Sequence, residues 1–156
     1  AITGAAGIAT DSKPFAMERA TSRGALTVPP GDDRVARIRE VTGGRGVDAV
    51  FDFVGSPETI DLAMKTVAVQ GRVTVAGIIG AGDFTWNFFA APWEVTLANT
   101  YWGTIEELHE LVALYQAGKI VTDTETFTLD TALTAYRRLE EGSLSGRAVI
   151  VPHARD

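Results

Sequence analysis

VDAVFDFV, residues 47–54, is the stretch that decides the fold class of this 156-residue chain. It is almost continuously apolar, which is typical of a parallel strand that other elements cover on both faces. Ser56 and Pro57 follow it as the cap and first-turn residues of a helix, and RVTVAGII (residues 72–79) is a second strand of the same kind. This alternation predicts right-handed strand–helix–strand units in an open, mostly parallel sheet.

The same alternation extends to both ends of the chain. Ser12 is the expected cap of a helix with Pro14 in its first turn, and the last helix is expected to turn Leu133, Tyr136 and Leu139 inward. Further strands are expected at 7–10, 26–28, 95–101, 124–128 and 147–151. Helices are expected between 12 and 24, 32 or 33 and 43, 56 and 71, and 104 and 118, and from 128 or 130 onward.

The composition excludes several classes of protein. With 46% hydrophobic and 22% charged residues the chain can fill a core, and its length favours one domain or slightly more. A net charge of −6 and scattered basic residues argue against nucleic acid as a partner. There is no cysteine, hence no disulfide and no thiolate metal site. Without an apolar run of ~18 residues or a signal peptide, we expect a cytoplasmic protein with no membrane partner.

Asp11 is the first candidate site residue, because it ends a short strand in GIATDSKPF (residues 7–15). A carboxylate there can accept hydrogen bonds from both hydroxyls of a ribose, and a Gly-rich phosphate turn normally precedes it by about 20 residues. Only ten residues precede Asp11, so the chain resembles a nucleotide-binding unit without its first third. A helix-capping role for Asp11 is an equally weighted alternative. A carboxylate favours NAD over NADP, but Lys13 and Arg19 weaken this preference, because a nearby basic side chain can bind the 2′-phosphate of NADP.

Other candidates lie at the ends of later strands, where doubly wound sheets bind ligands. Glycine there lets a ligand approach the backbone, although a turn requirement explains most such glycines. Tyr101 and Trp102 form a pocket wall or belong to a core or interface. The aromatic loop 84–93 indicates a subunit contact or an apolar substrate pocket. No nucleophile–base set or metal cluster is recognisable, so we assign no catalytic and no metal residue.

Four segments together carry a family resemblance: GGRGVDAVFDFVG (43–55), GRVTVAGIIG (71–80), TYWGTIEEL (100–108) and TFTLDTALTAYRRLEEGSLSGRAVIVP (126–152). The chain resembles the zinc-dependent medium-chain alcohol dehydrogenases, and most closely bacterial secondary-alcohol dehydrogenases of the actinomycete type. The resemblance implies an α/β fold, a partial Rossmann doubly wound parallel sheet that lacks its first strand. It implies a cofactor domain over residues 1–120 and a return to the catalytic domain over 121–156.

The resemblance also implies the chemistry: zinc-assisted hydride transfer between NAD and an alcohol or ketone in the intact enzyme. Zinc and its ligands would lie in an upstream catalytic domain, so the isolated chain would be inactive. The strand Val95 to Tyr101 would pair with a second copy in a dimer or tetramer. A zinc-less quinone or enone reductase and a non-catalytic nucleotide-binding module remain the alternatives. The implied cofactor residues are Asp11, Phe53, Val54, Gly55, Ala76, Gly77, Ile78, Trp102 and Arg147, with Tyr101 and Trp102 bordering the substrate.

Overall fold

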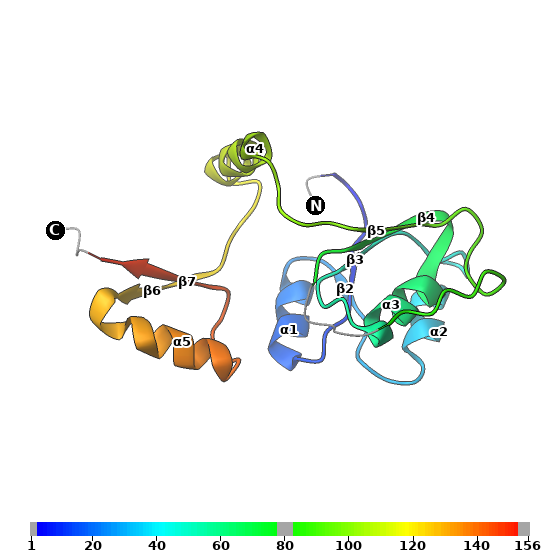
Figure 1. The fold of residues 1–156 in the computed structure, drawn as a ribbon, viewed down its shortest axis with the longest axis horizontal. Coiled ribbons are helices and arrows are strands. Elements are labelled where there is room, and N and C mark those ends of the chain that lie inside the picture. The colour runs from blue at the N-terminus through cyan, green and yellow to red at the C-terminus, as the bar shows by residue number, and fades with distance from the viewer. Residues whose placement is uncertain (1–2, 78–82, 153–156) are drawn as a thin grey trace. The chain divides into compact units, whose positions relative to one another are not determined.

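The computed structural model describes residues 3–77 and 83–152 (Figure 1). The chain divides into two compact units, one up to Trp102 and one from Gly103 onward, and each is described by itself. The predicted domain boundary after residue 120 stays a prediction. Within the described residues, no helix is long and apolar enough to cross a membrane.

The first unit begins with a short parallel pair, β1 (Ile8–Ala9) and β2 (Leu26–Thr27). Helix α1 (Pro14–Ser22) connects them, and α2 (Arg34–Val41) follows β2. Pro14 occupies the first turn of α1 as predicted, but the N-cap is Lys13 and not Ser12. The reason is that proline is pre-organised for the first helical position, so the residue directly before it becomes the cap.

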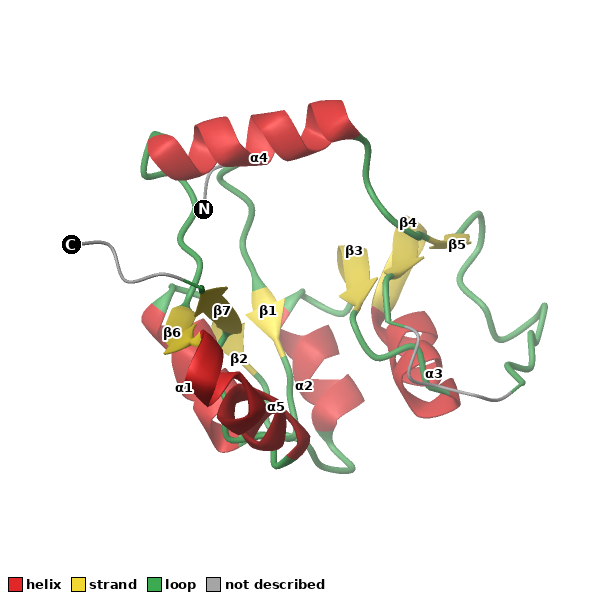
Figure 2. Ribbon diagram, turned by 60° about the vertical axis from the view of Figure 1, so that its left-hand side comes forward, coloured by secondary structure: helices red, strands yellow, loops and turns green. Residues whose placement is uncertain are grey.

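A three-stranded parallel sheet forms the centre of this unit, with β4 (Val67–Val75) between β3 (Val47–Asp52) and β5 (Thr96–Asn99). Helix α3 (Pro57–Thr66) packs against β3 and β4 (Figure 2). Its predicted cap is confirmed, because the Ser56 and Thr59 side chains bond reciprocally to each other's backbone N–H. The expected end at Gly71 is wrong, since the chain already pairs with β3 from position 67 and α3 ends before it.

The hydrophobic core lies between α3 and this sheet. Ala63 and Met64 of α3 and Val67 and Val73 of β4 are all buried, so one face of the helix packs on the strand that follows it. The other face of β3 differs from the prediction, because Phe51 is 64% exposed. Within the part of the chain that the structure describes, β3 is therefore covered on one face and not on two.

The strands of the first unit fall into two separate sheets, β1–β2 and β3–β4–β5. In a doubly wound sheet of order 3-2-1-4-5-6, the first strand lies between the second and the fourth. If β1 and β2 are the second and third strands of that order, and β3 to β5 the fourth to sixth, the interruption falls where the first strand belongs. The structure thus confirms an α/β fold with a partial, parallel Rossmann-like sheet.

The second unit contains α4 (Ile105–Gln116), β6 (Thr124–Thr128), a 3₁₀ turn (Leu129–Thr131), α5 (Ala132–Glu140) and β7 (Arg147–Val151). Strands β6 and β7 are parallel and α5 packs on β6.

The side of α5 that was predicted to face inward is not the buried one. Leu133, Tyr136 and Leu139 are exposed, and Ala135 is buried instead. A two-stranded ladder is too narrow to cover a wide apolar stripe, so the small residue makes the close contact.

Candidate cofactor-binding site

Asp52, the last residue of β3, organises the turn that follows this strand. Its Oδ1 accepts hydrogen bonds from the backbone N–H of Val54 at 2.9 Å and of Gly55 at 3.0 Å, and its Oδ2 accepts from the Thr59 hydroxyl at 2.8 Å. The residue is only 6% exposed. A buried carboxylate is tolerated here because several donors replace its water.

The sequence analysis missed Asp52 because it stands inside an apolar run. The usable pattern was an aspartate at a strand end, followed by two residues and a glycine, which is typical of a side chain that bonds to the backbone of its own turn.

The ends of β3, β4 and β5 meet at one edge of the sheet. The Asp52 carbonyl accepts from the N–H of Ala76 at 2.7 Å and of Gly77 at 3.0 Å, and the Val75 carbonyl accepts from the N–H of Thr100 at 2.9 Å. The structure thereby brings the predicted residues of the two neighbouring turns together: Phe53, Val54, Gly55, Ala76 and Gly77. Ile78 lies outside the described residues.

Gly55 and Gly77 are required by the contact between these two turns. Gly55 has a φ of +74°, and a Cβ placed on it would lie 2.4 Å from the Gly77 carbonyl oxygen. A Cβ on Gly77 would lie 2.3 Å from the Val54 backbone. Both distances are far below van der Waals contact, so the turn requirement accounts for these glycines whether or not a ligand also approaches them.

Large apolar side chains lie exposed at the same strand ends. Phe53 is 74% exposed, directly after β3. Tyr101 and Trp102, after β5, are 67% and 85% exposed, and their ring centroids lie 5.0 Å apart in an edge-to-face arrangement. None of the three belongs to the core, so the core alternative for Tyr101 and Trp102 does not hold in this structure. Exposed flat rings of this kind are suited to stack on a ligand or to enter an interface.

Asp11 is exposed, two residues beyond β1, and one of its oxygens is in use. Oδ1 accepts from the Lys13 N–H at 2.8 Å, while Oδ2 has no hydrogen-bond partner among the described residues. The N-cap of α1 is Lys13, so Asp11 orders the turn before the helix without being its cap. One free carboxylate oxygen suits a sugar hydroxyl.

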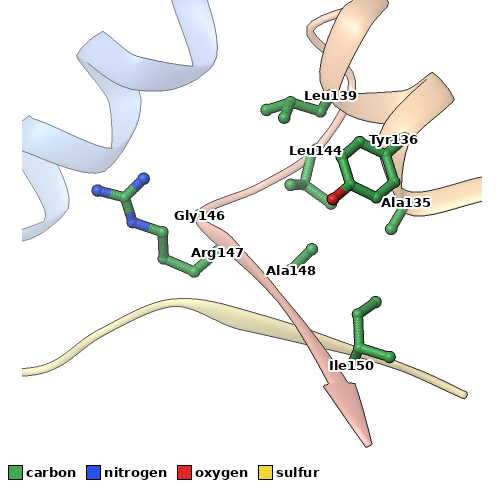
Figure 3. Close-up of a pocket in the computed structure, with 8 residues that line it drawn as sticks. All are labelled: Ala135, Tyr136, Leu139, Leu144, Gly146, Arg147, Ala148 and Ile150. Atoms are coloured by element: carbon green, nitrogen blue, oxygen red, sulfur yellow. The ribbon is translucent and has the colours of Figure 1, made fainter. Parts of the chain in front are cut away.

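Arg147 begins β7 in the second unit. Its N–H donates to the Asp123 carbonyl at 2.9 Å, and it pairs in register with Thr124. The side chain extends away from Ala148 and Ile150, which face α5 (Figure 3). It is exposed, and its guanidinium has no hydrogen-bond or ion-pair partner within the described residues.

A hollow of about 260 Å³ lies beside the other face of β7. Its lining is mostly apolar and consists of Ala135, Tyr136, Leu139, Leu144, Gly146, Arg147, Ala148 and Ile150 (Figure 3). Since the Arg147 side chain points away from the apolar members, the hollow and the guanidinium do not form one polar site.

In each unit a polar side chain has hydrogen-bonding capacity that the fold does not use. In the first unit the free Asp11 oxygen suits a ribose hydroxyl. In the second unit the Arg147 guanidinium suits the paired oxygens of a phosphate or pyrophosphate. In residues 3–77 and 83–152, no group of three or more His, Cys, Asp or Glu side chains is arranged to hold a metal. The described residues therefore provide no zinc site of their own.

Comparison with known proteins identifies the family. The model of the zinc-binding dehydrogenases matches residues 1–117, so the chain belongs to this family. An NAD-dependent alcohol dehydrogenase of Sulfurisphaera tokodaii is 33% identical, with 97% of this chain and 45% of the relative covered. The D-arabinose 1-dehydrogenase (NADP(+)) of Saccharolobus solfataricus is 31% identical over 88% of this chain and 38% of its own length.

The fold has the same relatives. The crystal structure of the alcohol dehydrogenase from the hyperthermophilic archaeon Aeropyrum pernix superposes with a TM-score of 0.78 at 33% identity, over 93% of this chain and 42% of that one. The chain thus spans less than half the length of each of these relatives.

Proposed function

We propose that this chain is the cofactor-binding part of an oxidoreductase that transfers hydride between NAD and an alcohol or ketone. The observation that carries the proposal is the meeting of three parallel strand ends at one edge, with exposed apolar rings beside them. Ligands of open α/β sheets bind at such an edge. Family membership and the NAD-dependent alcohol dehydrogenase among the relatives support the choice of cofactor and reaction.

The roles of the individual residues follow from their chemistry. Asp11 accepts hydrogen bonds from the adenosine ribose, and Arg147 binds the pyrophosphate as a bidentate donor. The turns after β3 and β4 (Phe53, Val54, Gly55, Ala76, Gly77 and Ile78) line the dinucleotide, while Tyr101 and Trp102 border the nicotinamide and the substrate. The bound cofactor supplies the hydride acceptor, and these residues hold it in register with the substrate.

We expect the 156-residue chain alone to be inactive. It contains no cysteine, and by the family resemblance the zinc ligands would belong to an upstream catalytic domain. The narrower assignment to bacterial secondary-alcohol dehydrogenases has no support from the relatives reported above, which are archaeal. We propose a homo-oligomer through the sheet edge, because β5 is the edge strand of its ladder.

An NADH titration of the full-length protein, followed by quenching of tryptophan fluorescence, tests the cofactor assignment. We expect saturable quenching, and about tenfold weaker binding in Asp11→Asn, because a charged acceptor is worth roughly 1.5 kcal/mol more than a neutral one. Asp61→Asn on the outer face of α3 is the matched control and should bind as the wild type does. Equal affinity in Asp11→Asn and wild type would remove the ribose role.

Metal analysis and activity assays of the same protein then distinguish the zinc-type enzyme from the two alternatives. Metal content together with alcohol oxidation supports the zinc-type enzyme, whereas reduction of quinones by a metal-free protein identifies the zinc-less reductase. Saturable binding without turnover of either substrate class would leave only the non-catalytic binding module.

A further inference from the structure

Glu125 of β6 holds the connection between α5 and β7. Its Oε1 accepts from the backbone N–H of Ser145 at 2.7 Å and from Nη2 of Arg138 at 3.1 Å. Its Oε2 accepts from Nη1 of Arg138 at 2.5 Å. One carboxylate on a strand therefore binds both a helix side chain and the loop that leads to the next strand.

Arg138 holds the other end of the same loop. Its Nη2 donates to the Ser143 carbonyl at 3.1 Å, and the Ser143 N–H donates back to the Arg138 carbonyl at 2.9 Å. Its guanidinium also lies over the Phe127 ring, 5.8 Å from the centroid. The Arg138 and Glu125 side chains are only 34% and 28% exposed, which limits the weakening of the pair by solvent.

The loop ends where Arg147 begins, and its backbone has little freedom there. Gly146 has a φ of +88°, and a Cβ on it would lie 2.2 Å from the Asp123 carbonyl oxygen. That same oxygen accepts the Arg147 N–H. The loop of residues 143–146 is thus fixed at its start by Arg138, in its middle by Glu125 and at its end by Asp123.

We propose that Glu125 and Arg138 are positioning residues for Arg147: by fixing loop 143–146 they set the place from which its guanidinium reaches the cofactor pyrophosphate. The inference rests on the proposed function of Arg147. A binding group on an ordered backbone loses less conformational entropy when the ligand arrives, so preorganisation raises affinity without adding a contact.

The same hydrogen bonds also favour the ionised form of the Glu125 side chain. The pKa of Glu125 is lowered, first by the hydrogen bond from Arg138 and then by that from the Ser145 N–H. The ionised form that binds both partners is therefore the favoured one at neutral pH.

A double-mutant cycle on the full-length protein tests this role, with the dissociation constant for NADH and the KM for NAD as readouts. Arg147→Met should weaken NADH binding about tenfold, since a hydrogen-bonded charge is lost. Glu125→Gln keeps an acceptor for Ser145 but loses the ion pair, and should weaken binding roughly fivefold, with kcat little changed. Arg138→Lys keeps the charge but loses the fork, and should resemble Glu125→Gln.

The decisive result is the coupling between the two sites. In an Arg147→Met background, Glu125→Gln should have less than about a twofold effect, because no guanidinium remains to be positioned. A full fivefold effect in that background would overturn the inference, as would wild-type affinity in both single variants at 125 and 138. The matched control is Asp61→Asn, which breaks the exposed Lys65–Asp61 ion pair of 2.6 Å and should not change affinity. If Arg147→Met itself binds normally, the pyrophosphate role fails first, and the positioning role with it.

Discussion

Two connections in this protein are each organised by a single carboxylate, and they differ in how that carboxylate is solvated. Asp52 is buried and bonds to two backbone N–H groups and one hydroxyl, with no cationic partner in residues 3–77 and 83–152. Glu125 is partly exposed and bonds to a guanidinium and one N–H. A carboxylate that accepts from the backbone of its own turn therefore acts mainly on folding. A carboxylate that holds a guanidinium and a neighbouring loop acts mainly on the position of that loop.

The largest expected effect on stability is at Asp52, the buried carboxylate. Asp52→Ala should lower the free energy of unfolding by about 3 kcal/mol, because it leaves two backbone N–H groups and the Thr59 hydroxyl without their acceptor. Urea denaturation followed by tryptophan fluorescence measures the loss. Asp48→Ala, on the same strand but exposed, is the control and should change stability little. A similar, small effect in both variants would show that the Asp52 turn is not a folding element.

Gly55→Ala separates backbone strain from steric clash in the same turn. We expect a loss of about 2 kcal/mol, since both the positive φ and the approach of the Gly77 oxygen oppose a Cβ. Gly118→Ala is the matched control, because Gly118 has a φ of +67° but nothing within 4 Å of its Cβ. It should cost roughly 1 kcal/mol, from strain alone. Equal losses in the two variants would mean that the contact between the turns can relax.

The contacts of the partly exposed Glu125 should depend on pH. Because the Glu125 pKa is lowered in the folded state, its stabilisation is present above the ordinary glutamate value and is lost as the pH falls through the lowered one. Hydrogen exchange of the Ser145 amide, corrected for intrinsic rates, should therefore show protection that is present at neutral pH and falls once the pH drops below the ordinary glutamate pKa. Glu125→Gln should remove that pH dependence. A profile that is the same in both proteins would contradict the role of the carboxylate.

The smallest expected effect on stability is at the aromatic loop. Phe89 is 85% exposed, so Phe89→Ser should change the free energy of unfolding by less than about 0.5 kcal/mol. If the loop contributes to an interface beside β5, the same change should weaken self-association, which sedimentation of the full-length protein at several concentrations measures. Asp83→Asn is a conservative control in the same loop. Unchanged self-association would leave the aromatic side chains to a substrate pocket.

Much of the architecture could be predicted from the sequence because it depends on local patterns. The apolar run 47–54 predicted β3, the Ser56 cap predicted α3, and the helix expected between 104 and 118 is α4. Helix capping and strand propensity depend on neighbours within a few residues, which is why these elements form where they were predicted. The predictions failed where residues far apart in the sequence determine the structure. The end of α3 was misplaced because the pairing of position 67 with β3 is non-local.

The candidate site divides in the same way. The sequence by itself determined which residue types follow the strands: a carboxylate at 11, glycines at 55 and 77, aromatic rings at 101 and 102, an arginine at 147. The tertiary structure alone decided that Gly55 and Gly77 touch each other, that Asp52 is a buried acceptor, and that Glu125 and Arg138 hold the loop before Arg147. The physical reason is that residue chemistry is local, whereas burial and hydrogen-bond partners depend on elements that only the folded chain brings together.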